Sequence, residues 1–204
     1  FMKKYMLALG LSLLTVLGLF TGCSPKAETA SGSDSLKIVA TIFPEYDWVR
    51  QVLGDRAGEV ELTLLLDSGT DLHSYQPTAA DMLTIGECDL FLYNGGESDA
   101  WVERVLATAA NPDRRTLSVM EVLGDSVLEE EVVEGMQEAE DHDHAEGEAH
   151  EEEADEHVWL SLRNARTACA EIARVLGELD PDHAAEYQTN AENYMAELEA
   201  LDGE

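Results

Sequence analysis

The sequence predicts an α/β fold in which a parallel four-stranded sheet is flanked by helices and followed by one long helix. Segments with strand character alternate four times with segments of helical spacing. This alternation is typical of a parallel sheet with helices on both faces. The strand segments are apolar along most of their length, as strands covered on both sides should be. About 140 residues of such structure are enough to bury a core.

Each expected strand is a short apolar or β-branched segment bounded by turn residues. The expected strands are residues 36–42, 60–66, 89–93 and 116–120. The expected helices between them are residues 44–53, 78–85 and 99–109. The first of these helices stops at Gly54, and the second begins with capping-box spacing from Thr78 to Asp81.

Two longer helices are expected after residue 156, over residues 162–179 and 181–204. Ser161 can cap the first, and Asp180 with Pro181 supplies an N-cap and a proline at the first position of the second. Apolar residues recur on one face of each helix at spacings of three and four. They are Leu162, Ala165, Cys169, Ile172, Leu176 and Leu179, then Ala184, Tyr187, Ala191, Tyr194, Leu198 and Leu201. The second of these stripes needs something to pack on.

Residues 1–22 have the layout of a secretory signal peptide. Two lysines precede an apolar run over residues 6–20, which is shorter than the roughly 20 residues of a membrane-spanning helix. Cys23 completes LFTGC, which resembles the bacterial lipobox, although Phe20 stands where leucine is usual. We therefore expect a lipidated Cys23, a polar tether over residues 23–35, and an exported protein anchored to the outer face of the cytoplasmic membrane. An ordinary cleaved signal, which would leave the protein in the periplasm, is the alternative.

Residues 124–156 interrupt the pattern of strands and helices. The chain carries a net charge of −31, and residues 129–156 hold many acids and no Lys or Arg. Such a charge excludes nucleic acid and anionic lipid surfaces as partners and favours cations. We expect a solvated, disordered insertion in which His142, His144 and His150 bind divalent metal ions weakly. A solvated acidic linker with incidental histidines would look the same.

Cys88 and Cys169 remain after Cys23. One pair in an exported chain could form a disulfide, but both residues lie in apolar stretches, which favours buried free thiols. The sequence contains no phosphate loop, no GxSxG motif and no CxxC motif. Any chemistry therefore rests on histidines and acids.

His73 lies in a loop that leaves the second expected strand and enters a helix. Ligands of open α/β sheets bind outside the carboxyl ends of the strands, and imidazole is a common ligand of zinc-like ions. This placement makes His73 a candidate metal ligand. A loop histidine that only caps a turn would give the same pattern, and the spacing alone favours neither.

His157 lies where the acidic insertion meets ordered chain. The apolar residues 158–160 are expected to pack, and Ser161 can begin the next helix, so the position of His157 is better fixed than those of the insertion histidines. His157 is the second candidate metal ligand, unless it is only the last residue of the charged run. His183 falls in the first turn of the last helix, and we expect no metal role for it.

These segments together resemble a known family. ATIFPEYDWVRQVLGDRAGEVELTLLLDSGTDLHSYQPTAADM, CDLFLYNGGESDAWVERVL and HVWLSLRNA are similar to the ZnuA-like substrate-binding lipoproteins of bacterial zinc ABC importers. HSYQPT and HVWLS are specific in this order, whereas either motif alone would be weak. The family also has an acidic, histidine-rich loop before the second motif, as this chain does.

The resemblance implies two α/β lobes joined by a long helix, with the metal ion held between them. It implies that His73 and His157 are the ligands of the first lobe, built from residues 36–123 and 157–180. Residues 181–204 would then be the linking helix. The second lobe and its ligands are expected to be missing, so we expect a truncated product. Zinc prefers four ligands in a tetrahedron, and two histidines leave two positions open.

The expected function is extracytoplasmic capture of Zn²⁺ and its delivery to an ABC permease and its ATPase, without catalysis. A Mn²⁺- or Fe²⁺-type relative shares the architecture, and only the histidine-rich insertion favours zinc. Two other classes are open. A metallohydrolase would need a third protein ligand and a positioned base, and a surface metal buffer or adhesin would need no transport partner.

Overall fold

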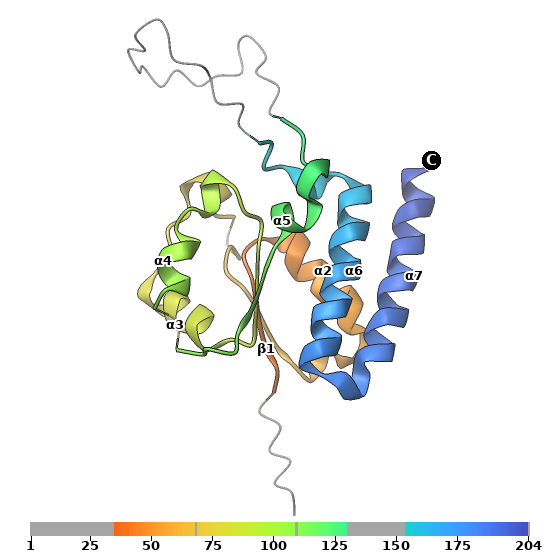
Figure 1. Ribbon diagram of the computed structural model, residues 1–204, viewed down its shortest axis with the longest axis horizontal. Coiled ribbons are helices and arrows are strands. Elements are labelled where there is room, and N and C mark those ends of the chain that lie inside the picture. Colours follow the sequence, from red (N-terminus) through yellow and green to blue (C-terminus); the bar gives the residue numbers. More distant parts are fainter. Residues whose placement is uncertain (1–34, 68, 109, 130–153, 204) are drawn as a thin grey trace, which may run out of the picture. The chain divides into compact units, whose positions relative to one another are not determined.

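Four parallel strands form the centre of the fold (Figure 1). The structure, a computed structural model, describes residues 35–67, 69–108, 110–129 and 154–203. The strands are β1 (Lys37–Ala40), β2 (Glu61–Leu64), β3 (Leu90–Tyr93) and β4 (Arg115–Ser118), in the order β2-β1-β3-β4. In the register of the sheet, Val39 lies between Thr63 and Phe91. The predicted parallel four-stranded sheet is confirmed.

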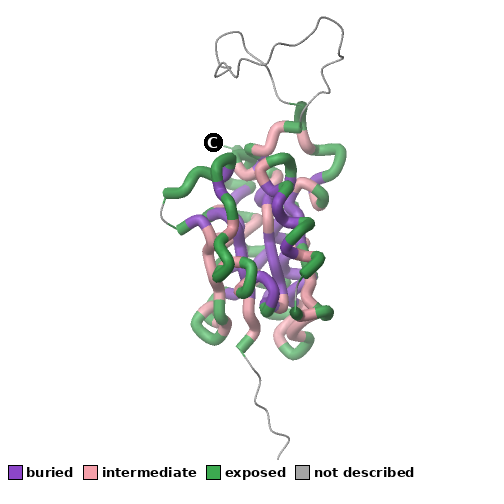
Figure 2. Tube along the Cα trace, turned by 90° about the vertical axis from the view of Figure 1, so that its left-hand side faces the viewer, coloured by how far each residue is buried: buried purple, intermediate pink, exposed green. Residues whose placement is uncertain are grey.

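Successive strand residues point into two different cores, one on each face of the sheet. Ile38 and Ala40 belong to the larger core, whereas Val39 belongs to the smaller one. In β3, Leu92 belongs to the larger core and Phe91 to the smaller one. The two central strands, β1 and β3, are buried along most of their length (purple in Figure 2) because both faces are covered.

Helices cover both faces of this sheet (Figure 1). The larger core lies under α2 (Phe43–Leu53), α5 (Val119–Leu123), α6 (Leu162–Leu179) and α7 (Ala184–Asp202). The smaller core lies under α3 (Ala79–Glu87) and α4 (Val102–Leu106). Short 3-10 helices connect these elements at Gly54–Gly58, Leu72–Ser74, Glu97–Asp99, Gly124–Ser126, Val158–Leu160 and Pro181–His183.

Local sequence signals account for most of the helix ends. Thr78 begins α3 with the predicted capping box, in which its hydroxyl accepts from the Asp81 backbone N–H. Ser161 caps α6 as predicted, accepting from the backbone N–H of Asn164. We expected the side chain of Asp180 to cap the last helix, but it makes no capping hydrogen bond. Its carboxylate instead accepts from the hydroxyl of Tyr187 at 2.7 Å.

One expected helix and one expected strand differ more from the structure. The helix expected over residues 99–109 is only the five-residue α4, preceded by a 3-10 turn. The strand expected to run to residue 120 ends at Ser118, whose hydroxyl caps α5 instead. An apolar run continues from β4 into α5, so hydrophobicity alone cannot mark the change from strand to helix.

The apolar stripe of α7 is largely covered. Tyr187, Ala191 and Leu198 are buried against α6 and α2, while Leu201 at the end of the helix is exposed. Within the described residues, no helix is long and apolar enough to cross a membrane.

Ordered structure reaches into both ends of the expected acidic insertion. Gly124–Ser126 forms a 3-10 turn, and Glu129 pairs with Ala154 in an isolated antiparallel bridge. His142, His144, His150 and Cys23 lie outside the described residues. The bridge holds the two ends of the insertion together, so residues 154–157 approach the sheet from a fixed point.

Both described cysteines are buried free thiols, as favoured from the sequence. Cys88 belongs to the smaller core and Cys169 to the larger one, so the sheet separates them. Burial raises the pKa of each thiol to about 12. The alternative of a Cys88–Cys169 disulfide is therefore wrong.

Candidate metal centre

Three loop segments meet at the carboxyl end of the sheet. One follows β2 and carries His73, one follows β3 and carries the turn Asn94–Asp99, and the third is the segment Ala154–His157 that returns from the insertion. Because parallel strands all end at the same edge, loops distant in sequence converge there. Hydrogen bonds between these loops, from Asn94 Nδ2 to the Glu156 carbonyl oxygen and between Ser98 Oγ and His73 Nδ1, show that they touch.

The loop after β2 holds the backbone of His73 in a short turn. Asp71 caps the 3-10 helix Leu72–Ser74 by accepting from the His73 backbone N–H at 2.9 Å. Leu72 and Tyr75 on either side are buried in the smaller core. Anchoring both neighbours leaves the imidazole on the surface, where its side chain is 53% exposed.

Packing on one side and a carboxylate on the other hold His157. The following residue, Val158, is buried, and the ring centre of Trp159 lies 5.3 Å from that of His157. Asp155 Oδ1 accepts from the His157 backbone N–H and lies 2.9 Å from Nδ1 of the same ring. These contacts lower the pKa of the Asp155 carboxyl, and the hydrogen bond from the His157 backbone has the largest effect. The expectation that Leu160 packs is wrong, because it is 75% exposed.

The structure brings the two predicted histidines together. The ring centres of His73 and His157 are 5.6 Å apart, with the ring planes at 53°. Two imidazoles that share a tetrahedral zinc ion at Zn–N distances of about 2.0–2.1 Å have ring centres roughly 5 Å apart. The observed spacing therefore suits one shared metal ion.

Both rings have Nδ1 occupied by a protein partner. His157 uses Nδ1 toward Asp155, and His73 Nδ1 lies 2.8 Å from Ser98 Oγ. In each ring Nε2 is then the nitrogen available to a metal ion. Metal-binding histidines commonly engage their second nitrogen in this way, which fixes the orientation of the ring.

Glu156 is a site residue that the sequence did not reveal. Its side chain is only 11% exposed, although it belongs in sequence to the acidic run. Its carboxylate accepts from the backbone N–H of Ser98 at 2.9 Å and also from the Ser98 hydroxyl. Asn94 donates from Nδ2 to the Glu156 carbonyl oxygen at 2.9 Å. A single glutamate in a run of acids gave no signal of this role.

Two further carboxyl groups are buried at this end of the sheet. Burial is the largest cause of the raised pKa of Asp99, at about 6, and of Glu45, at about 8. The charge of Glu156 raises the pKa of Asp99 further, and Asp99 does the same to Glu45. The three acids thus interact electrostatically, and a bound cation would stabilise their charged forms.

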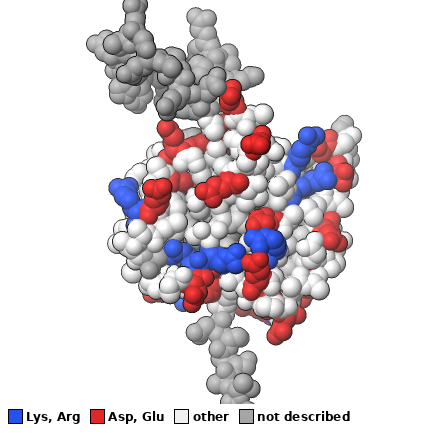
Figure 3. All heavy atoms as spheres, in the orientation of Figure 1, with Lys and Arg blue, Asp and Glu red and all other residues white. Residues whose placement is uncertain are grey.

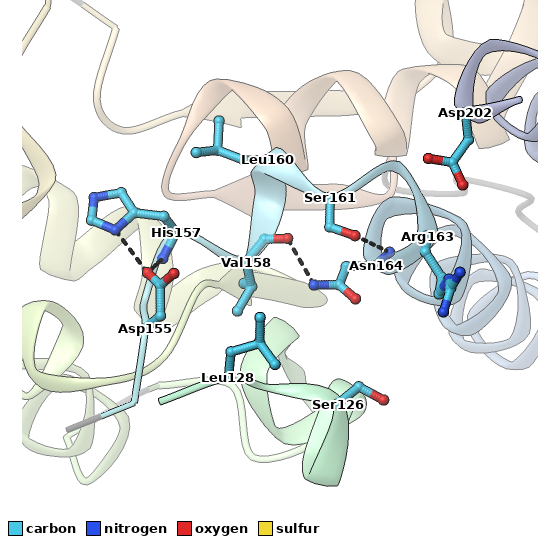
Figure 4. Close-up of a pocket in the computed structure, with 10 residues that line it drawn as sticks. All are labelled: Ser126, Leu128, Asp155, His157, Val158, Leu160, Ser161, Arg163, Asn164 and Asp202. Carbon is cyan, nitrogen blue, oxygen red and sulfur yellow. Dashed lines mark hydrogen bonds and ion pairs between the residues drawn. The ribbon is translucent and has the colours of Figure 1, made fainter. Parts of the chain in front are cut away.

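A groove of about 650 Å³ lies beside His157. Figure 4 shows His157 and Asp155 at one end of the residues that line it, and Arg163 and Asp202 toward the other end. His73 is not among the lining residues, so this groove is not the space between the two imidazoles. It gives solvent and other groups access to His157 from the side of α6.

Charged side chains of both signs share the described surface. In the view of Figure 3, basic and acidic groups lie next to one another. Ion pairs such as those of Arg115 with Glu178 and of Arg174 with Glu171 join the two signs in the described part of the chain. The face in this view therefore carries charges of both signs.

This edge of the sheet supplies two imidazoles, those of His73 and His157, as candidate metal ligands. Among the described residues, no group of three or more His, Cys, Asp or Glu side chains could hold a metal ion. His183 lies in the connection between α6 and α7, where its Nδ1 contacts Asp180. A four-coordinate ion bound by His73 and His157 would therefore need donors from elsewhere.

Comparisons with known proteins identify relatives over most of the chain. Residues 38–204 match the family model ZnuA, described as zinc-uptake complex component A periplasmic. The zinc-binding lipoprotein AdcA of Streptococcus pneumoniae is 34% identical over 201 residues, which are 98% of this chain and 37% of that protein. The manganese ABC transporter substrate-binding lipoprotein scaA of Streptococcus gordonii is 30% identical over 198 residues, 95% of this chain and 58% of that protein.

Solved structures agree with this grouping. The crystal structure of Zn(II)-bound AdcA from Streptococcus pneumoniae superposes with a TM-score of 0.63 at 28% identity, covering 83% of this chain and 32% of that one. The chain thus spans less than two thirds of the length of each of these relatives.

Proposed function

We infer the function of this chain from one premise: it belongs to the ZnuA family of zinc-uptake components. The family is one of solute-binding proteins, which are not enzymes. Its members include lipoproteins named for zinc and for manganese, so binding of a divalent transition metal ion is the shared activity. On this basis we propose that the chain binds Zn²⁺ outside the cytoplasm and delivers it to an ABC-type permease and its ATPase.

One observation carries the proposal. His73 and His157 come from loops far apart in sequence, yet their rings lie 5.6 Å apart, each with Nδ1 held by a neighbour. We propose that these two histidines bind the metal ion through Nε2 and that other donors complete the coordination.

Zinc is the proposed ion, with Mn²⁺ as the alternative. Imidazole nitrogen suits Zn²⁺, whereas Mn²⁺ favours oxygen donors such as carboxylates. His142, His144 and His150 support the preference for zinc as weak auxiliary binders. Lipidation of Cys23 would anchor the protein beside its permease, on the outer face of the membrane.

Calorimetric titration of the purified protein with Zn²⁺ and Mn²⁺ tests the ligands. We expect His73→Ala and His157→Ala each to remove the tightest site. Deletion of residues 136–150 should lower the number of bound ions and spare that site. His183→Ala is the matched control, because His183 also pairs with an aspartate but lies away from the pair. If the deletion removed the tight site and His157→Ala did not, the assignment would be wrong.

A cellular assay tests delivery. In bacteria that lack their own zinc-binding lipoprotein, the protein should restore uptake of radioactive zinc when a matching permease is present. The Cys23→Ser variant should do so less well. A protein that binds zinc at the surface but never restores uptake would be a metal buffer rather than a transport component.

A further inference from the structure

We propose that Ser98 is a positioning residue for His73, and that Glu156 holds Ser98 in the orientation this requires. This inference rests on the proposed function, because it assigns a role at the same metal centre. It links the two candidate ligands physically, since Glu156 directly precedes His157 in the chain. One hydroxyl and one carboxylate would then set how both loops present their imidazoles.

The contacts form a continuous path from one loop to the other. Ser98 Oγ lies 2.8 Å from His73 Nδ1, and the same hydroxyl donates to Glu156 Oε2. The backbone N–H of Ser98 donates to the other carboxylate oxygen, Oε1, at 2.9 Å. His73 Nδ1 is 3.8 Å from Glu156 Oε2, too far for a direct hydrogen bond, so the serine mediates the contact.

The single proton of the Ser98 hydroxyl decides the tautomer of the neutral His73 ring. A hydroxyl carries one proton, and a carboxylate has none to give. Because Ser98 donates its proton to Glu156, it can only accept from His73, so Nδ1 of that ring carries the hydrogen. The lone pair is then on Nε2, the nitrogen that a metal ion can use. The path therefore selects the binding-competent form of His73 before any ion arrives.

The position of Glu156 is itself built into the fold. Its carbonyl oxygen accepts from the buried Asn94, and its carboxylate lies over Gly96, where no side chain is present. The carboxylate is thus held by the turn after β3 and by the segment that leads to His157. A residue that only solvated the acidic run would not need this fit.

Zinc affinity and ring tautomer together test the proposal. We expect Ser98→Ala and Glu156→Gln each to weaken the tight zinc site by about 10–100-fold, the usual effect of losing an outer partner of a ligand. Ser98→Thr keeps the hydroxyl and should retain most of the affinity. Ser35→Ala is the control, because it also removes a hydroxyl that donates a hydrogen bond, in this case to the Glu59 carbonyl oxygen.

Nitrogen NMR of the metal-free protein gives a readout that a merely structural role would not change. With selectively labelled histidine, wild type should show the His73 ring with hydrogen on Nδ1. In Glu156→Gln the new amide can donate to Ser98 Oγ, which frees the hydroxyl to donate to Nδ1. The Nε2–H tautomer should then increase in Glu156→Gln, and the preference for Nδ1–H should weaken in Ser98→Ala.

The outcomes separate this proposal from the proposed function. If wild type binds zinc through His73 while Ser98→Ala and Glu156→Gln change neither tautomer nor affinity, the positioning role is overturned and the metal site stands. If the tight zinc site persists without His73, the ligand assignment made under the proposed function fails. In that case the tautomers of the metal-free variants still decide whether Ser98 and Glu156 orient the ring.

Discussion

The carboxylate of Glu156 occupies the space that a side chain on Gly96 would need. A β-carbon on Gly96 would lie 2.3 Å from Glu156 Oε1, closer than any real contact of this kind. The backbone of Gly96 also has φ near +79°, a conformation that side chains disfavour. The turn after β3 thus accepts the glutamate only because glycine is present.

Gly96→Ala should therefore impair both stability and metal binding. We expect a loss of about 1–3 kcal/mol in the free energy of unfolding from the positive φ, measured by urea denaturation without metal. Displacement of Glu156 should also weaken zinc binding in calorimetry. Gly69→Ala is the control for φ alone, because Gly69 has φ near +73° and no atom within 4 Å of the added carbon. Equal zinc affinity in both variants would contradict the role of Glu156.

Asp155 should matter for metal binding through His157. Its Oδ1 is the partner of the His157 Nδ1 and of the backbone N–H of the same residue. Asp155→Ala should weaken the tight zinc site by about 10–100-fold, since the ring loses the group that orients it. Asp155→Asn keeps an acceptor oxygen and should lose less. If both variants titrate like wild type, His157 is oriented by Trp159 packing instead.

The two buried thiols should be unreactive in the folded protein. Burial raises the pKa of Cys88 and Cys169 to about 12, so little thiolate forms near neutral pH. In a Cys23→Ser background at pH 8, a thiol reagent should label neither cysteine quickly, and both after addition of denaturant. Fast labelling of either one in native protein would show that its core opens readily. A non-reducing gel should show no internal disulfide.

Local patterns were sufficient for much of the fold. Alternating strand and helix segments predicted the parallel sheet, and the caps at Thr78 and Ser161 lie where the spacing placed them. The patterns failed where one element passes directly into another. The apolar run across β4 and α5 reads as one segment, and the helix after Ser118 is marked only by the cap that the Ser118 hydroxyl provides.

Of the candidate site, only the two histidines could be predicted from local patterns. His73 and His157 each stand beside apolar residues that pack, so the sequence fixes their backbones. Ser98 and Glu156 lack any such signal. A serine in a glycine-rich turn and an acid in an acidic run are ordinary in sequence, and their pairing depends on two loops meeting in space. The same limit applies to Asp180, which looked like a cap and instead binds a tyrosine.

Glu45 should make stability depend on pH. It is fully buried near the start of α2, where Oε2 accepts from the backbone N–H and the hydroxyl of Thr41. Oε1 has no hydrogen-bond partner among the described residues. Burial raises the pKa of this carboxyl from 4.5 to about 8. The folded state therefore keeps the proton over a pH range in which the unfolded chain has lost it.

The sign of the effect follows from proton binding. Between about pH 5 and 8 the folded state binds more protons than the unfolded one. The contribution of Glu45 to the free energy of unfolding therefore falls as pH rises, by roughly 1.4 kcal/mol per pH unit. Below that range the contribution is fully present, and above about pH 8 it is lost. Glu45→Gln mimics the protonated acid at every pH, because its amide oxygen can accept the bonds that Oε2 accepts.

Urea unfolding of both proteins across pH 5 to 9 measures the difference. Glu45→Gln should match wild type near pH 5 and exceed its free energy of unfolding increasingly up to pH 8. Comparing the two proteins cancels the titration of the other carboxylates. Glu171→Gln is the matched control, because this partly exposed acid has its pKa lowered by its hydrogen bond to Arg174 rather than raised by burial. A constant difference between wild type and Glu45→Gln over the whole range would mean that Glu45 is already ionised in the folded protein at pH 5.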